Sequence, residues 1–138
     1  MCGDCKRRYE QNPLRILDCK VDHDHECMKN APKMSDYLNE TSQEYFNTVC
    51  ELLDKLEIPY EVDDKLVRGL DYYTHTVFEI VSMNSEMGAQ STVLAGGRYD
   101  GLISYFGGPE GMSGIGWALG MERLLIALEA EGIELEQK

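Results

Sequence analysis

Apolar side chains recur at helical spacing in the first half of the chain. The members of this stripe are Tyr45, Phe46, Val49, Leu52, Leu53 and Leu56. The run Thr41-Ser42-Gln43-Glu44 comes just before and matches a capping box, in which a hydroxyl and a carboxylate satisfy free N–H groups of the first turn. Pro59 disfavours helical backbone at the residue before it. The pattern predicts an amphipathic helix over residues 42–56 that serves as scaffold.

β-branched and aromatic side chains fill residues 72–81, which contain neither glycine nor proline. Such a run is typical of a β-strand, and alternation along it places Tyr73 and Glu79 on one face and Tyr72 on the other. Residues 91–95 form a second strand candidate. Because the short polar segment between the two runs suits a hairpin, the strands are expected to be antiparallel neighbours.

A last apolar series predicts a buried helix near the end of the chain. Its members are Ile115, Leu119, Met121, Leu124, Leu125 and Leu128. Gly132 is placed to end this helix, and residues 131–138 form a polar tail. Helices and antiparallel strands together predict an α+β fold.

The composition is that of a globular protein, since 43% of the 138 residues are apolar. No run approaches the ~20 apolar residues of a membrane span, and no signal-peptide pattern follows Met1, so a cytoplasmic location without membrane association is expected. The net charge of −12 argues against a principal role in nucleic-acid binding, which depends on basic surface. The small basic cluster of Lys6, Arg7, Arg8 and Arg15 is interpreted as solvated.

Five cysteines are an odd number, and in a cytosolic chain they favour reduced thiols over disulfides. Six side chains near the N-terminus offer enough ligands for zinc: Cys2, Cys5, Cys19, His23, His25 and Cys27. However, no second Cys-x-x-Cys pair follows the first, and acidic residues are interleaved with the other candidates. No metal site is therefore assigned.

Arg68 and the pair Tyr72-Tyr73 are candidates for ligand binding. A guanidinium fork suits a phosphate or a carboxylate, and phenol hydroxyls suit a small polar ring such as imidazole. The alternative is a strand entrance with a surface pair between Asp71 and Arg68, and with the tyrosines half in the core. Local chemistry alone favours that alternative.

Two glycine-rich segments follow. Gly96-Gly97 predicts an unusual backbone path, and the Arg98 and Tyr99 that come next could either lock that turn or line a pocket. The run Gly114-x-Gly116-x-x-x-Gly120 misses the spacing of a dinucleotide-binding motif by one residue, and the chain has no P-loop.

Several longer runs follow one another along the chain. They are Asn12-Pro13-Leu14-Arg15-Ile16-Leu17-Asp18, Leu66-Val67-Arg68-Gly69-Leu70-Asp71-Tyr72-Tyr73 with Thr76-Val77-Phe78-Glu79, Ala95-Gly96-Gly97-Arg98-Tyr99-Asp100-Gly101-Leu102, and Gly114-Ile115-Gly116-Trp117-Ala118-Leu119-Gly120-Met121-Glu122-Arg123-Leu124. In this order they resemble a bacterial insertion-domain segment, the two histidine-specific motifs and the third class II motif of the histidyl-tRNA synthetases. The resemblance covers nearly the whole chain.

This resemblance implies an aminoacyl-tRNA ligase. Histidine would attack the α-phosphate of ATP to give histidyl-adenylate, and the histidyl group would then pass to tRNA(His). ATP with Mg²⁺ is implied as a substrate of the intact enzyme, no bound cofactor is implied for this segment, and the expected assembly is a homodimer. Such transfers depend on positioning and on cations placed against developing charge.

The resemblance also assigns the histidine site by position. Arg68 matches an arginine near the histidine carboxylate and the α-phosphate, and is the expected catalytic residue. Tyr72 and Tyr73 match the pair that lines the imidazole pocket, and Tyr99 is a further candidate for histidine binding.

For the nucleotide, Arg123 matches the arginine that holds the ATP phosphates. Gly116 and Gly120 let the backbone approach the nucleotide closely.

The implied organisation has three parts. Residues 1–60 resemble a helical insertion-domain segment, residues 61–130 the C-terminal half of the class II core (an antiparallel sheet flanked by helices), and residues 131–138 a tail. The other class II motifs and the anticodon-binding domain are expected outside this chain. The isolated chain is therefore expected to be inactive in adenylation and to pair with another copy or rearrange its helices.

Two other functions stay open. A histidine-sensing regulatory paralogue of the synthetase, used in histidine biosynthesis, would share the fold, and a non-catalytic interaction module would keep the motifs without binding histidine or ATP. Arg68 beside Gly69 and the insertion-like segment favour the ligase, because adenylation needs that cation at the phosphate.

Overall fold

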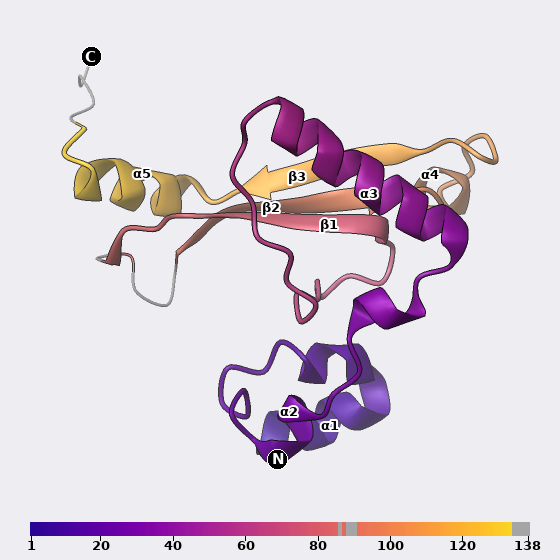
Figure 1. Cartoon of the computed structure of the whole chain (residues 1–138), viewed down its shortest axis with the longest axis horizontal. Helices are drawn as coiled ribbons and strands as arrows, with labels where there is room; N and C mark the ends of the chain where they lie inside the picture. Colours follow the sequence, from indigo (N-terminus) through magenta and orange to yellow (C-terminus); the bar gives the residue numbers. More distant parts are fainter. Residues whose placement is uncertain (86, 88–90, 134–138) are drawn as a thin grey trace. The chain divides into compact units, whose positions relative to one another are not determined.

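The structure, a computed structural model, describes residues 1–85, 87 and 91–133 (Figure 1). The chain divides into two compact units, Met1–Asp71 and Tyr72–Lys138. The expected insertion-domain boundary at residue 60 stays a prediction, and most of the expected tail, residues 134–138, lies outside the described part. None of the helices formed by the described residues combines the length and the apolar character needed to cross a bilayer.

The first unit consists of helices joined by turns, as expected for the N-terminal part of the chain. Its elements are α1 (Gly3–Gln11), η1 (Pro13–Ile16), α2 (Glu26–Lys29), η2 (Met34–Tyr37) and α3 (Glu40–Lys55).

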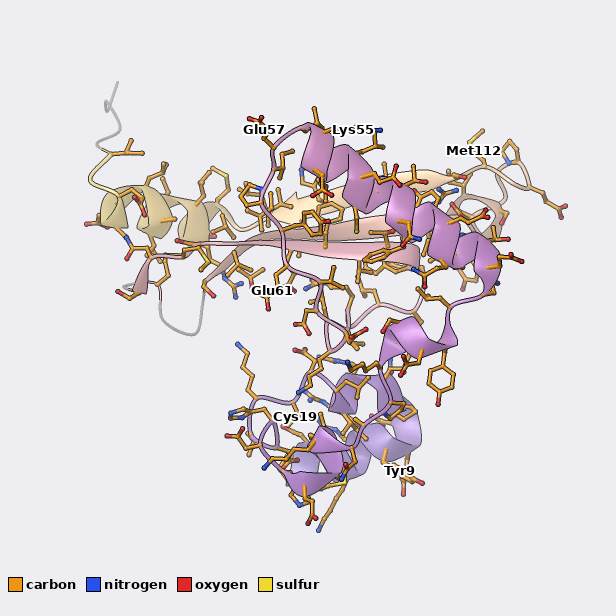
Figure 2. All side chains as sticks on the ribbon, viewed as in Figure 1. Tyr9, Cys19, Lys55, Glu57, Glu61 and Met112 are labelled. Carbon is orange, nitrogen blue, oxygen red and sulfur yellow. The ribbon has the colours of Figure 1, made fainter. Side chains whose placement is uncertain are left out.

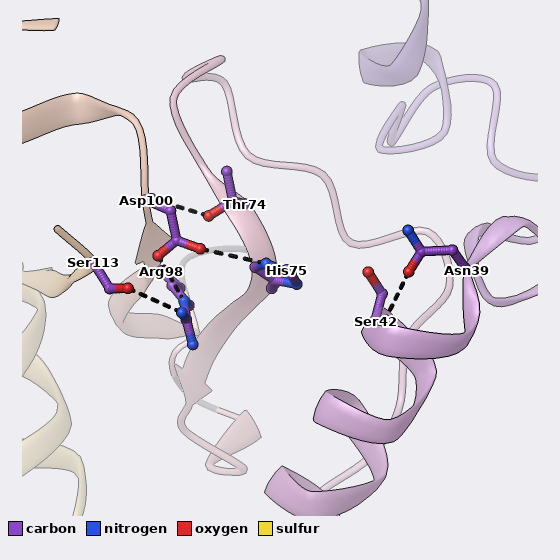
Figure 3. A network of polar contacts seen from close by, with 7 residues as sticks. All are labelled: Asn39, Ser42, Thr74, His75, Arg98, Asp100 and Ser113. Atoms are coloured by element: carbon purple, nitrogen blue, oxygen red, sulfur yellow. Dashed lines mark hydrogen bonds and ion pairs between the residues drawn. The ribbon is translucent and has the colours of Figure 1, made fainter. Parts of the chain in front are cut away.

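The helix expected over residues 42–56 is confirmed as α3, but its predicted cap is wrong. Asn39 lies in extended backbone and its side-chain oxygen accepts a hydrogen bond from the Ser42 backbone N–H at 2.8 Å (Figure 3). Thr41 lies inside the first turn. Because asparagine caps helices better than threonine, the helix begins about two residues earlier than the capping-box pattern predicts.

A left-handed residue, Glu57, ends α3 ahead of Pro59. The φ of Glu57 is +55°. The Ile58 N–H donates to the Leu53 carbonyl, and the Glu57 N–H to the Asp54 carbonyl, each at 3.0 Å. These two bonds form a Schellman motif, which satisfies carbonyls of the last turn. Figure 2 labels Glu57 at this end of the helix.

The second unit is built on a three-stranded antiparallel sheet in the order β1-β2-β3. Its elements are β1 (Thr74–Val81), β2 (Thr92–Tyr99), α4 (Leu102–Tyr105), β3 (Gly114–Leu119) and α5 (Met121–Ala130). Figure 1 shows the three strands side by side, with α5 beyond the end of β3. The α+β class and the antiparallel pairing of the first two strands are confirmed.

Two predictions from local pattern are wrong in this unit. Gly96 and Gly97 form no turn, because both lie buried within β2. Ile115 and Leu119 lie in β3, so the last helix begins only at Met121, and none of its side chains is fully buried. Small residues alternate with large ones from residue 114 to 119, which is strand periodicity, and this strand pairs with the glycines of β2.

Candidate functional site

Three tyrosine rings gather on one face of the sheet in the second unit. Tyr72 and Tyr73 come just before β1, and their ring centroids lie 4.7 Å apart. Tyr99, the last residue of β2, meets Tyr72 edge-on at a centroid distance of 5.9 Å. All three are half-buried, so aromatic surface remains open to a ligand. The structure thus brings together the three tyrosines predicted to bind histidine, and their side of the sheet is called the tyrosine face below. The expectation that Tyr72 lies on the opposite face from Tyr73 is wrong, because Tyr72 precedes β1 and strand alternation does not apply to it.

Glycines beneath the rings make this packing possible. A Cβ at Gly97 would lie 2.7 Å from Tyr73 Cδ1, and a Cβ at Gly116 would lie 2.8 Å from Tyr99 Oη. Gly114, two residues earlier in β3, is crowded by the same Tyr99 ring. Gly97 pairs with Gly116, and Tyr99 pairs with Gly114. Adjacent strands therefore present bare backbone to the rings, and a side chain at these positions would displace a ring.

Glu79 lies on the tyrosine face, as alternation predicts. Tyr73 covers Gly97, which pairs with Val77, and Glu79 follows Val77 by two residues along β1. The Glu79 carboxylate accepts a hydrogen bond from the Thr92 hydroxyl at 2.9 Å. This bond fixes the carboxylate near the start of β2.

Arg98 points to the opposite side of the sheet from Tyr99. Its Nε donates to Asp100 Oδ1 at 2.7 Å and its Nη2 donates to Ser113 Oγ at 3.1 Å (Figure 3). His75 Nε2 lies 3.3 Å from the other oxygen of the same carboxylate. The Arg98 guanidinium holds the pKa of the Asp100 carboxyl below its usual value. Arg98 thus locks the end of β2, and only Tyr99 of the two reaches the tyrosine face.

Residues expected to contact the nucleotide lie along β3 and at the start of α5. Gly120 caps α5, and its N–H donates to the Val93 carbonyl at 3.0 Å. Arg123, in the first turn of α5, is exposed and donates from Nη1 to the Thr92 carbonyl at 2.9 Å. Gly116 lies on the tyrosine face beside Tyr99. Of the residues assigned to ATP, Gly116 therefore adjoins the tyrosines, whereas Gly120 and Arg123 lie at the other end of β2, beside Val93 and Thr92.

Arg68 belongs to the first unit. It is half-buried and its Nε is shielded from solvent. At the next residue, Gly69, a Cβ would lie 3.5 Å from the guanidinium carbon of Arg15. Asp71 accepts a hydrogen bond from the Asn12 side chain at 2.9 Å. Arg15, expected to be solvated, is instead half-buried beside this segment, and it is a second cation that sequence reasoning missed. Contact of Arg68 with a ligand stays a prediction.

Three of the six candidate zinc ligands also come together in the first unit, with an aspartate. The ligand atoms of Cys2, Cys5, Cys19 and Asp22 all lie within 4.8 Å of one another. The other three candidates make local contacts. His23 Nδ1 lies 2.8 Å from the Lys20 carbonyl oxygen, and His25 Nδ1 accepts from the Cys27 backbone N–H at 3.2 Å.

The surroundings of this cluster shift the pKa values of three of its members. The backbone N–H of Cys2 holds the pKa of the Asp22 carboxyl well below its usual range. The N–H of Asp22 lowers the pKa of the Cys19 thiol, whereas a hydrogen bond to Asp22 and burial raise the pKa of the Cys5 thiol. A carboxylate and two thiols whose pKa values shift in opposite directions therefore lie beside one another.

Comparison with known proteins points to one family. The family model described as histidyl-tRNA synthetase matches residues 9–124. Histidine–tRNA ligase of Geobacillus thermodenitrificans (strain NG80-2) is 58% identical over 135 residues, which are 98% of this chain and 32% of that protein. Histidine–tRNA ligase of Staphylococcus carnosus (strain TM300) is 57% identical over 137 residues, which are 99% of this chain and 32% of that protein.

A solved structure is similar over the same extent. The crystal structure of apo S. aureus histidyl-tRNA synthetase matches with a TM-score of 0.70 and 46% sequence identity, covering 99% of this chain and 32% of the other. The chain spans about a third of the length of the curated relatives it matches.

Proposed function

Because this chain belongs to the histidyl-tRNA synthetase family, we propose that it forms part of a histidine–tRNA ligase whose histidine site includes the tyrosine face. Imidazole is a flat aromatic ring with two nitrogens that donate or accept hydrogen bonds. Aromatic faces and phenol hydroxyls match both properties. The observation that supports this best is the convergence of Tyr72, Tyr73 and Tyr99 over Gly97 and Gly116.

The proposed nucleotide site extends from the tyrosine face along β3 to the start of α5. Arg123 is exposed at the start of α5, and an arginine fork suits phosphate oxygens. Gly120 caps the same helix, so backbone N–H groups of its first turn also favour an anion there. Mg²⁺ enters with ATP and shields the phosphate charge. Gly116 leaves the backbone of β3 uncovered beside the tyrosines, where adenylate would join the two substrates.

Arg68 has the proposed catalytic role. A histidine carboxylate oxygen attacks the α-phosphorus of ATP, and pyrophosphate leaves with the electrons of the broken P–O bond. Negative charge gathers at the α-phosphate during this step, and a nearby guanidinium lowers its energy. The terminal ribose hydroxyl of tRNA(His) then attacks the acyl carbon, and AMP leaves. A homodimer and a cytoplasmic location complete the proposal by family resemblance.

A segment exchange tests the proposal. This chain replaces the matched segment of the Geobacillus thermodenitrificans ligase, and histidine-dependent exchange of pyrophosphate into ATP is measured. The chimera is expected to exchange at a rate close to that of its parent, whereas the 138-residue chain alone is expected to show none. A folded chimera without exchange would contradict the ligase proposal, and one that still bound histidine would favour a histidine-sensing role.

Arg68→Ala in the chimera is expected to lower the exchange rate about 10²-fold or more, a scale typical of losing a transition-state contact. Arg7→Ala is the matched control, because Arg7 forms an exposed pair with Asp4 at 2.9 Å. Its rate should equal that of the chimera. An unchanged rate after Arg68→Ala would remove Arg68 from the catalytic role and leave the ligase assignment intact.

A further inference from the structure

A cluster of four potential metal ligands lies in the first unit, and the proposed histidine chemistry makes no use of it. Its members are Cys2, Cys5, Cys19 and Asp22, called the four-ligand cluster below. Cys2 caps α1 and Cys5 lies in its first turn, while Cys19 and Asp22 belong to the turn between η1 and α2. Two separate segments therefore bring two donors each to one place.

The two segments repeat one local geometry. The Cys5 N–H donates to Cys2 Sγ at 3.4 Å, and the Asp22 N–H donates to Cys19 Sγ at 3.4 Å. In each turn the residue three positions later both donates this bond and adds a ligand. Such N–H···S bonds stabilise thiolates and orient metal ligands. Asp22 thus takes the position that the fourth cysteine has in paired Cys-x-x-Cys sites, which explains why the spacing of cysteines alone does not reveal a second pair.

The distances suit tetrahedral zinc. Zinc–sulfur bonds of about 2.3 Å place tetrahedral ligand atoms about 3.8 Å apart. Cys2 Sγ lies 3.8 Å from Cys19 Sγ, and Cys19 Sγ lies 3.9 Å from Asp22 Oδ2. Because every separation in the cluster is within 4.8 Å, shifts of about 1 Å would complete the coordination shell.

Burial in the first unit is concentrated at this cluster. The structure describes all of residues 1–71, and the buried ones among them are Cys5, Cys19, Asp22 and Met28. Large apolar side chains are exposed instead, with Tyr9 at 71% and Val21 at 77%. Figure 2 shows Tyr9 projecting outward from the helix that carries it. A small unit without an apolar core needs another source of stability, and a metal ion is a common one.

Charge supports the same conclusion. As thiolates, the three cysteines would repel one another and the Asp22 carboxylate, so they can bind as thiolates only with a cation between them. A divalent cation between them removes that repulsion. The surface hollow beside Cys2 and Cys19 is lined by Arg8 and Lys20 and also by Asp4 and Asp18, so the charges around it balance and the neutralising charge comes from the ion itself.

We propose that the four-ligand cluster binds one zinc ion through three thiolates and one carboxylate, and that this ion holds the N-terminal part of the first unit folded. Four protein ligands leave no open position, which is the character of a structural zinc site. A disulfide between Cys2 and Cys19 is the competing outcome, but it would leave the buried Asp22 carboxylate without a cation beside it.

Metal analysis of the whole 138-residue chain tests the site. The chain is produced with zinc in the medium and purified under reducing conditions, and its metals are measured by mass spectrometry. One zinc ion per chain is expected. After chelation, cobalt(II) chloride alone should restore a tetrahedral site, seen as intense visible bands together with thiolate-to-cobalt charge transfer. A metal-free chain, weak octahedral cobalt bands, or a Cys2–Cys19 disulfide in alkylated peptides would overturn the proposal.

Variants separate the cluster from the other thiols. Cys19→Ser should lower bound zinc about tenfold or more, whereas Cys27→Ser and Cys50→Ser, outside the cluster, should keep it. Asp22→Cys should keep one zinc ion and raise the charge-transfer intensity by about one third, as the thiolates increase from three to four. The Asp22→Cys variant tests the zinc site even if Cys19→Ser fails to fold. An unchanged intensity, or equal zinc loss in Cys50→Ser, would contradict the assignment.

An NMR spectrum of the backbone amides tests whether the zinc ion holds the N-terminal part of the first unit folded. Removing zinc should erase the dispersed signals of α1 and leave those of β1 to β3 in place. Signals of α1 that are unchanged in the metal-free chain would show that the ion does not hold this part of the fold.

Discussion

The two units of this chain are organised around opposite kinds of centre. The first buries thiols and a carboxylate at the four-ligand cluster and leaves apolar side chains such as Tyr9 exposed. The second sets aromatic rings on bare backbone at Gly97 and Gly116. One centre is defined by side chains that attract a cation, and the other by the absence of side chains.

Because of this difference, the two units should be destabilised by different kinds of substitution. Electrostatics and coordination control the first, so loss of a ligand or of the proposed zinc ion should unfold its N-terminal part. Shape controls the second, so an added side chain should do the damage there. Variants that affect one unit and spare the other therefore test whether the two units depend on different forces.

The largest effect in the second unit is expected from Gly97→Val. The new side chain would collide with the Tyr73 ring and with the Thr76 carbonyl oxygen, 2.8 Å from the added Cβ. We expect a loss of about 3 kcal/mol in the free energy of unfolding, as for overpacked sites. Urea unfolding followed by fluorescence of Trp117, the only tryptophan and a residue of β3, measures it.

Gly101→Val is the control for that substitution, because nothing lies within 4 Å of a Cβ at Gly101. Zinc content should be the same in both variants and in the parent. Equal stability of the two variants would show that the glycine in β2 is not required beneath the ring.

A smaller, pH-dependent effect is expected from Asp100→Asn. The folded pKa of Asp100 lies below its unfolded value because of the Arg98 guanidinium. Its contribution to stability is therefore present above the unfolded pKa of about 3.9 and is lost as pH falls through the lower folded pKa. Asp100→Asn should cost about 1 kcal/mol in the free energy of unfolding at neutral pH, and less in acid.

Trp117 fluorescence during urea unfolding at several pH values gives this difference. Glu110→Gln, an exposed acidic position in the same unit, is the control and should change stability little at any pH. If the cost of Asp100→Asn did not shrink in acid, the Arg98–Asp100 pair would not be the source of the stability.

The local pattern of apolar and polar residues predicted the elements whose whole pattern lies within one segment of the sequence. The apolar stripe of α3 and the β-branched run of β1 lie within single segments, so periodicity found both. Periodicity failed for β3, because Ile115 and Leu119 also fit the helical series that continues into α5. The cap of α3 was placed at Thr41, although Asn39 is the better cap and lies two residues earlier.

The residues of the candidate site were also predicted only in part from the sequence. Resemblance supplied Tyr72, Tyr73 and Tyr99, and the structure places their rings together. The role of Gly97 beneath Tyr73 depends on strand register, which only the folded sheet shows. Asp22 is one of the interleaved acidic residues that argue against a zinc site in the sequence, although the step from Cys19 to Asp22 repeats the step from Cys2 to Cys5.

A crystal structure of the chimeric ligase with histidine is the most direct test of the tyrosine face. The imidazole is expected against the rings of Tyr72, Tyr73 and Tyr99, over the glycine backbone of β2 and β3. An imidazole on the opposite side of the sheet, where Trp117 is 64% exposed, or one away from the sheet altogether, would contradict the proposed histidine site.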